Sequence, residues 1–230
     1  MGWQGAIEDQ SREVTFWGYV YDFAWSKAIA GLHERLQQEI RLGNLALERV
    51  PRRLDNILLV LTRDDRLVLG LRGRNMDEAN KWMVSCGESF DPNKHGEPGE
   101  INLEKLVRQT LSDSDELGIP EQAVEKILPL GILTEWNGLM GNVAALVKLT
   151  TEMEQARKYW QESQRSEIYA IDSIPFTLQA CVRLIKETKH WFDGRRENLP
   201  LVKASVIALL LALVHEFPGD QILLAIQSPQ

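Results

Sequence analysis

Carboxylate side chains gather around one amphipathic segment near the middle of the chain. Four of them lie within or just after the segment that begins at Leu103: Glu104, Asp113, Asp115 and Glu116. A fifth, Glu100, lies just before it. Mg²⁺ prefers oxygen ligands, so carboxylates at a junction between a loop and a helix can hold that ion. The alternative is a solvated helix face, because runs of charge usually face water.

A strand, a loop and a helix are expected to position these acids. The apolar run Trp82–Ser85 predicts a short strand, and the prolines and glycines between Phe90 and Gly99 predict a loop. Asn102 is a suitable N-cap for the helix that follows. One buried helical face is predicted by residues at helical spacing: Leu103, Leu106, Val107 and Leu111. We expect this helix to end at Leu117–Gly118, because Gly readily adopts the left-handed conformation found after a helix.

Further elements are predicted on both sides of this segment. Aromatic and β-branched runs predict strands at 14–23, 57–62, 67–71, 127–134, 143–149 and 168–171. Helical spacing or composition predicts helices at 28–40, 152–164, 177–190 and 201–217. The polar residues 1–13 are expected to form no regular element. Cys181 falls within an apolar helical stripe, which indicates a core thiol and not a nucleophile.

Length, charge and cysteine content limit the functional classes. The 230 residues suit one large domain, or a smaller domain with extensions. The formal net charge of −7 argues against binding to duplex nucleic acid, which needs a cationic surface. The two cysteines form neither a disulfide framework nor a zinc motif, which favours a cytoplasmic protein. No signal peptide is expected, and the longest apolar run, Val206–Val214, is too short to span a bilayer.

The acidic segment resembles the Nudix box, whose usual form is G-x5-E-x7-R-E-U-x-E-E-x-G-U, where U is an apolar residue. Glu100 and Arg108 match the E-x7-R portion, and Asp115–Ile119 matches the E-E-x-G-U portion with Asp for the first Glu. The match is degenerate, because five residues separate Gln109 from Asp115 where the pattern has two. Gln109 itself replaces the Glu of the R-E pair, and Lys94 stands at the leading Gly position.

The extra residues within the box leave two geometries open. A continuous helix would carry Asp115 about 60° around the axis and about 4.5 Å along it from its expected place. A bulge or loop at Ser112–Ser114 would restore that place. Because Mg²⁺ demands near-octahedral geometry, a metal site tolerates such a shift less well than the fold does.

The resemblance implies a fold class and a division of the chain. We expect an α+β fold, a Nudix-like α/β/α sandwich with a mixed β-sheet, over residues 54–188. Residues 1–53 would form an N-terminal strand and helix extension, and residues 189–230 a C-terminal helical extension. We expect both to pack on the domain or against a second copy of the chain, as in a homodimer.

The resemblance also implies a reaction and assigns residues to it. Nudix proteins hydrolyse nucleoside diphosphate derivatives, with Mg²⁺ neutralising the diphosphate and activating a water. Asp115, Glu116 and Glu100 would bind the metal. Glu116, Glu100 and Arg108 would form the catalytic group, with Arg108 orienting a box carboxylate. A small nucleotide-like ligand is the expected partner, and neither duplex nucleic acid nor a membrane is.

Three further residues complete the predicted site by binding substrate. Arg72 and Arg74 would lie near the substrate end of the sheet, although both could simply be solvated at a strand end. Glu88 could compensate for the charge that is lost at Gln109, or could cap its loop. Glu167 resembles an acidic residue often found before a late strand in relatives.

The neutral Gln109 should weaken Mg²⁺ binding, so the resemblance predicts a divergent hydrolase with weak or altered activity. The alternative is a non-catalytic Nudix-fold module that binds a nucleotide or a protein partner. Fold alone does not decide between them.

Overall fold

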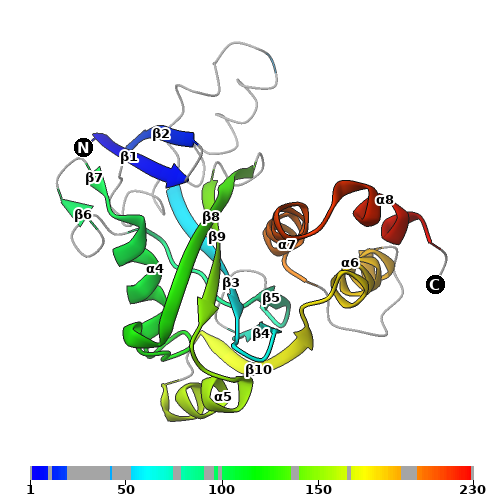
Figure 1. The fold of residues 1–230 in the computed structure, drawn as a ribbon. Coiled ribbons are helices and arrows are strands. Elements are labelled where there is room, and N and C mark those ends of the chain that lie inside the picture. Colours follow the sequence, from blue (N-terminus) through cyan, green and yellow to red (C-terminus); the bar gives the residue numbers. More distant parts are fainter. Residues whose placement is uncertain are drawn as a thin grey trace.

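The structure is a computed structural model that describes residues 2–9, 12–19, 42, 53–74, 79–90, 96–97, 100–135, 140–164, 167–192 and 201–228. Its larger sheet has six strands in the order β10-β4-β3-β9-β8, with β5 beside β4 (Figure 1). These strands are β3 (Arg53–Leu61), β4 (Arg66–Arg72), β5 (Trp82–Val84), β8 (Val124–Glu135), β9 (Met140–Leu149) and β10 (Ile168–Pro175). The β3–β9 pair is parallel and the other pairs are antiparallel, so the sheet is mixed, as predicted.

The centre of the larger sheet is buried on both faces. Leu58, Val60 and Leu146 have no exposed surface, and the apolar runs of β3 and β9 are nearly continuous. Such runs are typical of parallel strands covered on two sides. Helix α4 (Leu103–Ser112) covers one face and α7 (Lys203–Glu216) the other (Figure 1). The expected α/β/α sandwich is therefore confirmed.

A smaller sheet lies at the N-terminal end of α4, with strand order β2-β1-β7-β6 (Figure 1). Its strands are β1 (Gly2–Asp9), β2 (Arg12–Tyr19), β6 (Gly96–Glu97) and β7 (Glu100–Ile101). The prediction that residues 1–13 lack regular structure is wrong, because β1 pairs along its whole length with β2 and also with β7. These are backbone hydrogen bonds, which leave little mark on the side-chain pattern. The helix predicted for residues 28–40 lies outside the described residues.

The remaining helices are α5 (Met153–Glu162), α6 (Leu178–Phe192) and α8 (Gly219–Gln227). The helices predicted at 152–164, 177–190 and 201–217 are confirmed as α5, α6 and α7. The sequence pattern does not predict α8, because Pro218 and Gly219 read as a stop. In the structure α7 ends at Glu216 with Phe217 as its C-cap, and Pro218 serves as the N-cap of α8. Among the described residues, none of the helices has the length and apolar character needed to cross a membrane.

Helix α7 is fastened directly to the larger sheet. The Val202 amide donates to the Trp82 carbonyl over 2.7 Å, and the Val84 amide donates to Ser205 Oγ over 3.1 Å. Ala208 and Leu209 are fully buried in the same apolar core as β3 and β9. The C-terminal helices are thus placed by packing on the domain and by hydrogen bonds to β5.

Candidate functional site

A buried asparagine joins the three segments that surround the candidate site. Asn56, on β3, is only 2% exposed. Its Nδ2 donates to Thr110 Oγ1 on α4 over 2.8 Å, and its Oδ1 accepts from the Glu88 amide over 2.8 Å. A side chain at Gly87 would collide with the Asn56 carbonyl oxygen, so this close approach requires glycine. Asn56 therefore fixes Glu88 relative to α4.

Helix α4 begins as predicted but ends earlier. Asn102 Oδ1 accepts from the Lys105 amide over 2.9 Å, which confirms the N-cap. The predicted end at Leu117–Gly118 is wrong, because the last helical residue is Ser112 and Asp113 is the C-cap. Asp113 then organises a turn, with its Oδ1 accepting from the Asp115 amide over 2.9 Å and its carbonyl accepting from Gly118 over 3.0 Å. Gly118 does adopt the expected left-handed conformation, with φ of 61°.

This turn buries the Glu116 carboxyl. Glu116 is 3% exposed, and burial is the main cause that raises its pKa well above the usual 4.5. The Glu167 charge and a hydrogen bond to Glu167 raise the pKa further, whereas Arg72 acts in the opposite direction. Burial and a neighbouring carboxyl group thus both favour the protonated form of Glu116. Across the described part of the chain, no atom forms a hydrogen bond with Glu116 Oε2.

Backbone hydrogen bonds place Glu167 opposite Glu116. The Glu167 amide donates to the Asp115 carbonyl over 3.1 Å, and the Glu167 carbonyl accepts from the Gly73 amide over 2.8 Å. The end of β4, the start of β10 and the turn after α4 therefore meet at one point. Buried Cys86 also lies near this junction, since burial first, then Glu116 and Glu88, raise the pKa of its thiol. We call Glu88, Glu116, Glu167 and Arg72 the carboxylate cluster.

The structure brings together some of the predicted site residues. Glu116, Glu88 and Arg72 all belong to the carboxylate cluster, and Arg74 is exposed two residues beyond Arg72. Asp115 is half-buried beside Glu116, and its carbonyl holds Glu167. These positions come from three separate segments, which only the fold could bring together.

Glu100 lies apart from Asp115 and Glu116. Glu100 belongs to β7, before the first residue of α4, whereas Asp115 and Glu116 follow the last. The ten residues of this helix, at about 1.5 Å each, separate the two ends by about 15 Å. The backbone thus places Glu100 and Glu116 at opposite ends of α4.

Arg108 forms its ion pair with a different acid from the one expected. Its Nη2 and Nε lie 2.8 Å and 3.0 Å from Glu104 Oε1, and Nη1 donates to the Glu121 carbonyl over 2.8 Å. The expected partner was a carboxylate of the box, and Glu104 lies one helical turn before Arg108. Arg108 thus ties the first half of α4 to the segment before β8.

Among the described side chains, the acids around Glu116 are not grouped as a metal site. Within the described residues, no group of three or more His, Cys, Asp or Glu side chains is arranged to hold a metal ion. Gln109 Oε1, at the position of the missing box carboxylate, is buried and has no hydrogen-bond partner there.

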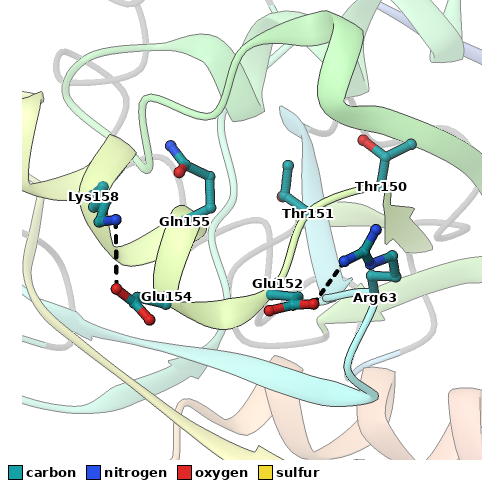
Figure 2. A pocket seen from close by; sticks show the side chains of 7 residues that line it. All are labelled: Arg63, Thr150, Thr151, Glu152, Glu154, Gln155 and Lys158. Atoms are coloured by element: carbon teal, nitrogen blue, oxygen red, sulfur yellow. Dashed lines mark hydrogen bonds and ion pairs between the residues drawn. The ribbon is translucent and has the colours of Figure 1, made fainter.

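A pocket of about 360 Å³ opens elsewhere, at the start of α5 (Figure 2). Its walls come from the turn after β3, the end of β9 and α5: Arg63, Thr150, Thr151, Glu152, Glu154, Gln155 and Lys158. Arg63 pairs with Glu152 over 2.6 Å, and Lys158 pairs with Glu154 over 3.4 Å (Figure 2). Both cations are thus compensated. The pocket contains none of the predicted site residues, and we assign the candidate site to the carboxylate cluster.

Two residues of the site carry weaker signals in the sequence. Asn56 is a polar residue inside an apolar strand, and a buried amide there needs partners. Asp113, followed by Ser114 and Asp115, has the composition of a turn. The proximity of Glu116 to Glu167 has no local signal, because the two residues lie in separate elements.

Comparison with known proteins gives structural likenesses only. No family model matches the chain, and no curated protein does. The chain is similar to the MutT Nudix hydrolase from Burkholderia pseudomallei, with 18% identity, a TM-score of 0.43, and coverage of 70% of this chain and 98% of that one. It is also similar to the Nudix domain of Shewanella oneidensis NrtR, complexed with ADP-ribose, with 13% identity, a TM-score of 0.48, and coverage of 78% and 99%.

A third similar structure is the bifunctional NMN adenylyltransferase/ADP-ribose pyrophosphatase from Francisella tularensis, complexed with AMP and a Mn ion. Its identity is 9% and its TM-score 0.44, and the match covers 85% of this chain and 50% of that one. At such identities and TM-scores, the structural similarity assigns no residue role and no activity to this chain.

Proposed function

We propose that this chain is a Nudix-fold protein that binds a small nucleotide-like ligand without magnesium-dependent hydrolysis. The observation that carries the proposal is Gln109, a neutral side chain with a buried Oε1 at the position of a box carboxylate. A neutral amide brings no negative charge to a metal site, where a hard cation needs charged oxygens.

The ligand class rests on the box resemblance and on two arginines. Arg72 lies at the end of β4 within the carboxylate cluster, and exposed Arg74 follows it. Guanidinium groups bind phosphate oxygens through two parallel hydrogen bonds. A nucleoside diphosphate derivative, approaching from the end of β4, is therefore the ligand we propose. The two described cysteines, Cys86 and Cys181, are buried free thiols, which fits the proposed cytoplasmic location.

The second candidate function is a weak, divergent magnesium-dependent hydrolase. One observation favours it, namely that Glu116 Oε2 lacks a partner among the described residues while Glu88 and Glu167 lie near. A ligand that opened the Glu116–Glu167 contact would free charged oxygens for an ion. The two candidates differ in whether ligand binding depends on Mg²⁺.

Calorimetric titration with ADP-ribose, with and without Mg²⁺, separates the candidates. We expect the wild type and Glu116→Gln to bind ADP-ribose with the same affinity under both conditions. We expect Arg72→Ala to bind at least about tenfold more weakly, because it loses a charged contact to phosphate. The matched control is Glu125→Gln, which neutralises an exposed acid on β8.

Two results would contradict the proposal. Mg²⁺-dependent affinity that disappears in Glu116→Gln but persists in Glu125→Gln would favour the hydrolase. Absence of any heat of binding with the wild type would reject ADP-ribose-like ligands altogether.

A further inference from the structure

The segment of residues 85–88 begins with a strained backbone that hydrogen bonds hold in place. Ser85 is fully buried and has a positive φ of 66°, which is unfavourable for a residue with a side chain. Its Oγ donates to the Val68 carbonyl and accepts from the Val60 amide, each over 2.8 Å. Such strain persists where surrounding contacts fix it, and it clusters at active sites and ligand sites. The segment thus has one fixed position against β3 and β4.

Strand β3 and α4 fix the other end of the segment, at Glu88. The Leu58 amide donates to the Cys86 carbonyl, and the Asn56 amide donates to the Glu88 carbonyl, each over 2.9 Å. The Asn56 side chain accepts from the Glu88 amide and donates to Thr110, as described above. Thr110 Oγ1 in turn lies 3.5 Å from Glu88 Oε2. Asn56 and Thr110 therefore determine where the Glu88 carboxylate lies.

One carboxyl oxygen near Glu88 lacks a hydrogen-bond partner among the described residues. This oxygen is Oε2 of Glu116, a residue that is 3% exposed. Glu88 is close enough to act electrostatically on the same carboxyl. A polar atom buried without a partner is costly, and it indicates a place for a further polar group. A hydroxyl both donates and accepts, so it can pair with this oxygen in either protonation state of Glu116.

We propose that Glu88 recognises hydroxyl groups of the ligand, and that Asn56 and Thr110 are positioning residues for this contact. The inference rests on the proposed binding of a diphosphate derivative at Arg72 and Arg74. The two arginines bind the diphosphate through charged hydrogen bonds, whereas the Glu88 carboxylate accepts from hydroxyls and repels phosphate. The ligand is thus a diphosphate joined to a sugar or another group with several hydroxyls, and bare pyrophosphate is disfavoured.

Calorimetric titrations with ADP-ribose and with inorganic pyrophosphate, both in EDTA, test the role of Glu88. We expect Glu88→Ala to bind ADP-ribose at least about tenfold more weakly, because it loses a charged hydrogen bond to a hydroxyl. The same variant should bind pyrophosphate as tightly as the wild type or more tightly, because a like charge is removed. The matched control is Glu125→Ala, at an exposed acid on β8, which should leave both affinities unchanged.

The same titrations test the positioning role of Thr110. Thr110→Val should weaken ADP-ribose binding about threefold or more and leave pyrophosphate binding unchanged, whereas Thr110→Ser keeps the hydroxyl and should restore the wild-type affinity. The control is Thr62→Val, which removes a buried hydroxyl that is hydrogen-bonded to the Arg66 carbonyl. Thr62 lies six residues from Asn56 along an extended chain, about 20 Å away, so neither affinity should change.

The outcomes separate this inference from the proposed function. ADP-ribose affinity that is unchanged in Glu88→Ala but falls in Arg72→Ala overturns the inference and leaves the proposed function in place. An equal loss for both ligands in Thr110→Val, or no recovery in Thr110→Ser, rejects the positioning role. A loss in Glu88→Ala that appears only with Mg²⁺ assigns Glu88 to a metal site and also overturns the inference. A wild type that binds neither ligand rejects the proposed function together with the inference.

Discussion

The chemistry of Glu116 is set by what lies around it. Its carboxyl is buried in the turn after α4 near Glu167 and Arg72, and burial raises its pKa well above that of an exposed glutamate. A box motif predicts such a residue as a metal ligand, because it records residue types and spacing alone. The environment instead gives this carboxyl the properties of a neutral hydrogen-bond donor.

Glu116 should make the folded state less stable as the pH rises. Its pKa is raised in the folded state, so below pH 4.5 both states carry the proton and no penalty arises. Above pH 4.5 the unfolded state loses the proton first, and the stability of the folded state falls until the pH reaches the folded pKa. We expect Glu116→Gln to raise the free energy of unfolding at pH 8 by about 1.4 kcal/mol or more, and to have little effect at pH 4.

Urea denaturation at several pH values measures this difference. Glu125→Gln, an exposed neutralisation, should follow the wild-type curve at every pH. If Glu116→Gln is less stable than the wild type at pH 8, the Glu116 carboxyl is ionised and stabilising, which is the opposite of what its burial implies.

At the scale of the element, the short helix α4 and the turn after it determine where the acids lie. The start of α4 could be predicted, because Asn102 and the spacing of Leu106, Val107 and Leu111 are local signals. The end could not be placed from Gly118, since that glycine closes the turn and not the helix. The Asp113 carboxylate competes for backbone amides and stops the helix five residues earlier.

The sequence predicts most strands of the larger sheet for a related reason. The hairpin of β3 and β4 and the pair β8 and β9 have apolar runs that reveal a buried sheet. By contrast, β1, β6 and β7 exist through pairing between distant backbones. The contact of Glu116 with Glu167 is equally nonlocal, so the sequence could identify the two residues but could not predict that they lie close together.

Gly118 should be intolerant of any side chain. Its φ of 61° is strained for other residues, and a Cβ there would lie 3.0 Å from Ser163 Cβ and 3.3 Å from the Tyr159 carbonyl oxygen. We expect Gly118→Ala to lower the free energy of unfolding by about 2 kcal/mol or more, measured by urea denaturation. The control is Gly219→Ala, where an added Cβ would meet no described atom within 4 Å beyond its chain neighbours. The free energy of unfolding should therefore stay the same or rise slightly.

At the scale of the whole molecule, the C-terminal helices and the sheet share one core. Leu209 on α7 is fully buried with β3 and β9, and Ser205 is hydrogen-bonded to β5. Lys186 on α6 also donates to the Ala225 and Ser228 carbonyls at the end of α8, over 3.1 Å and 2.6 Å. The helices at the end of the chain are therefore held to the domain and to one another.

A shared core predicts that α7 and the sheet unfold together. We expect Leu209→Ala to cost about 2–5 kcal/mol, and tryptophan fluorescence and circular dichroism should report the same shifted transition. Tyr169→Ala, at a largely exposed side chain, should change stability by no more than about 0.5 kcal/mol at the same protein concentration. Two separate transitions in Leu209→Ala would mean that α7 and the sheet are independent.

The parallel pairing of β3 with β9 has a consequence for how the protein is made. Arg53 pairs with Met140 and Leu61 with Lys148, so the central strand leaves the ribosome long before its neighbour is synthesised. Until β9 is made, the leucines, isoleucine and valine of β3 lack the parallel strand that pairs with them in the folded sheet. Nascent chains with such delayed, long-range contacts fold slowly and expose apolar surface that is prone to aggregation. Chaperones that bind apolar segments should therefore bind residues 57–61 before the second half of the chain has been synthesised.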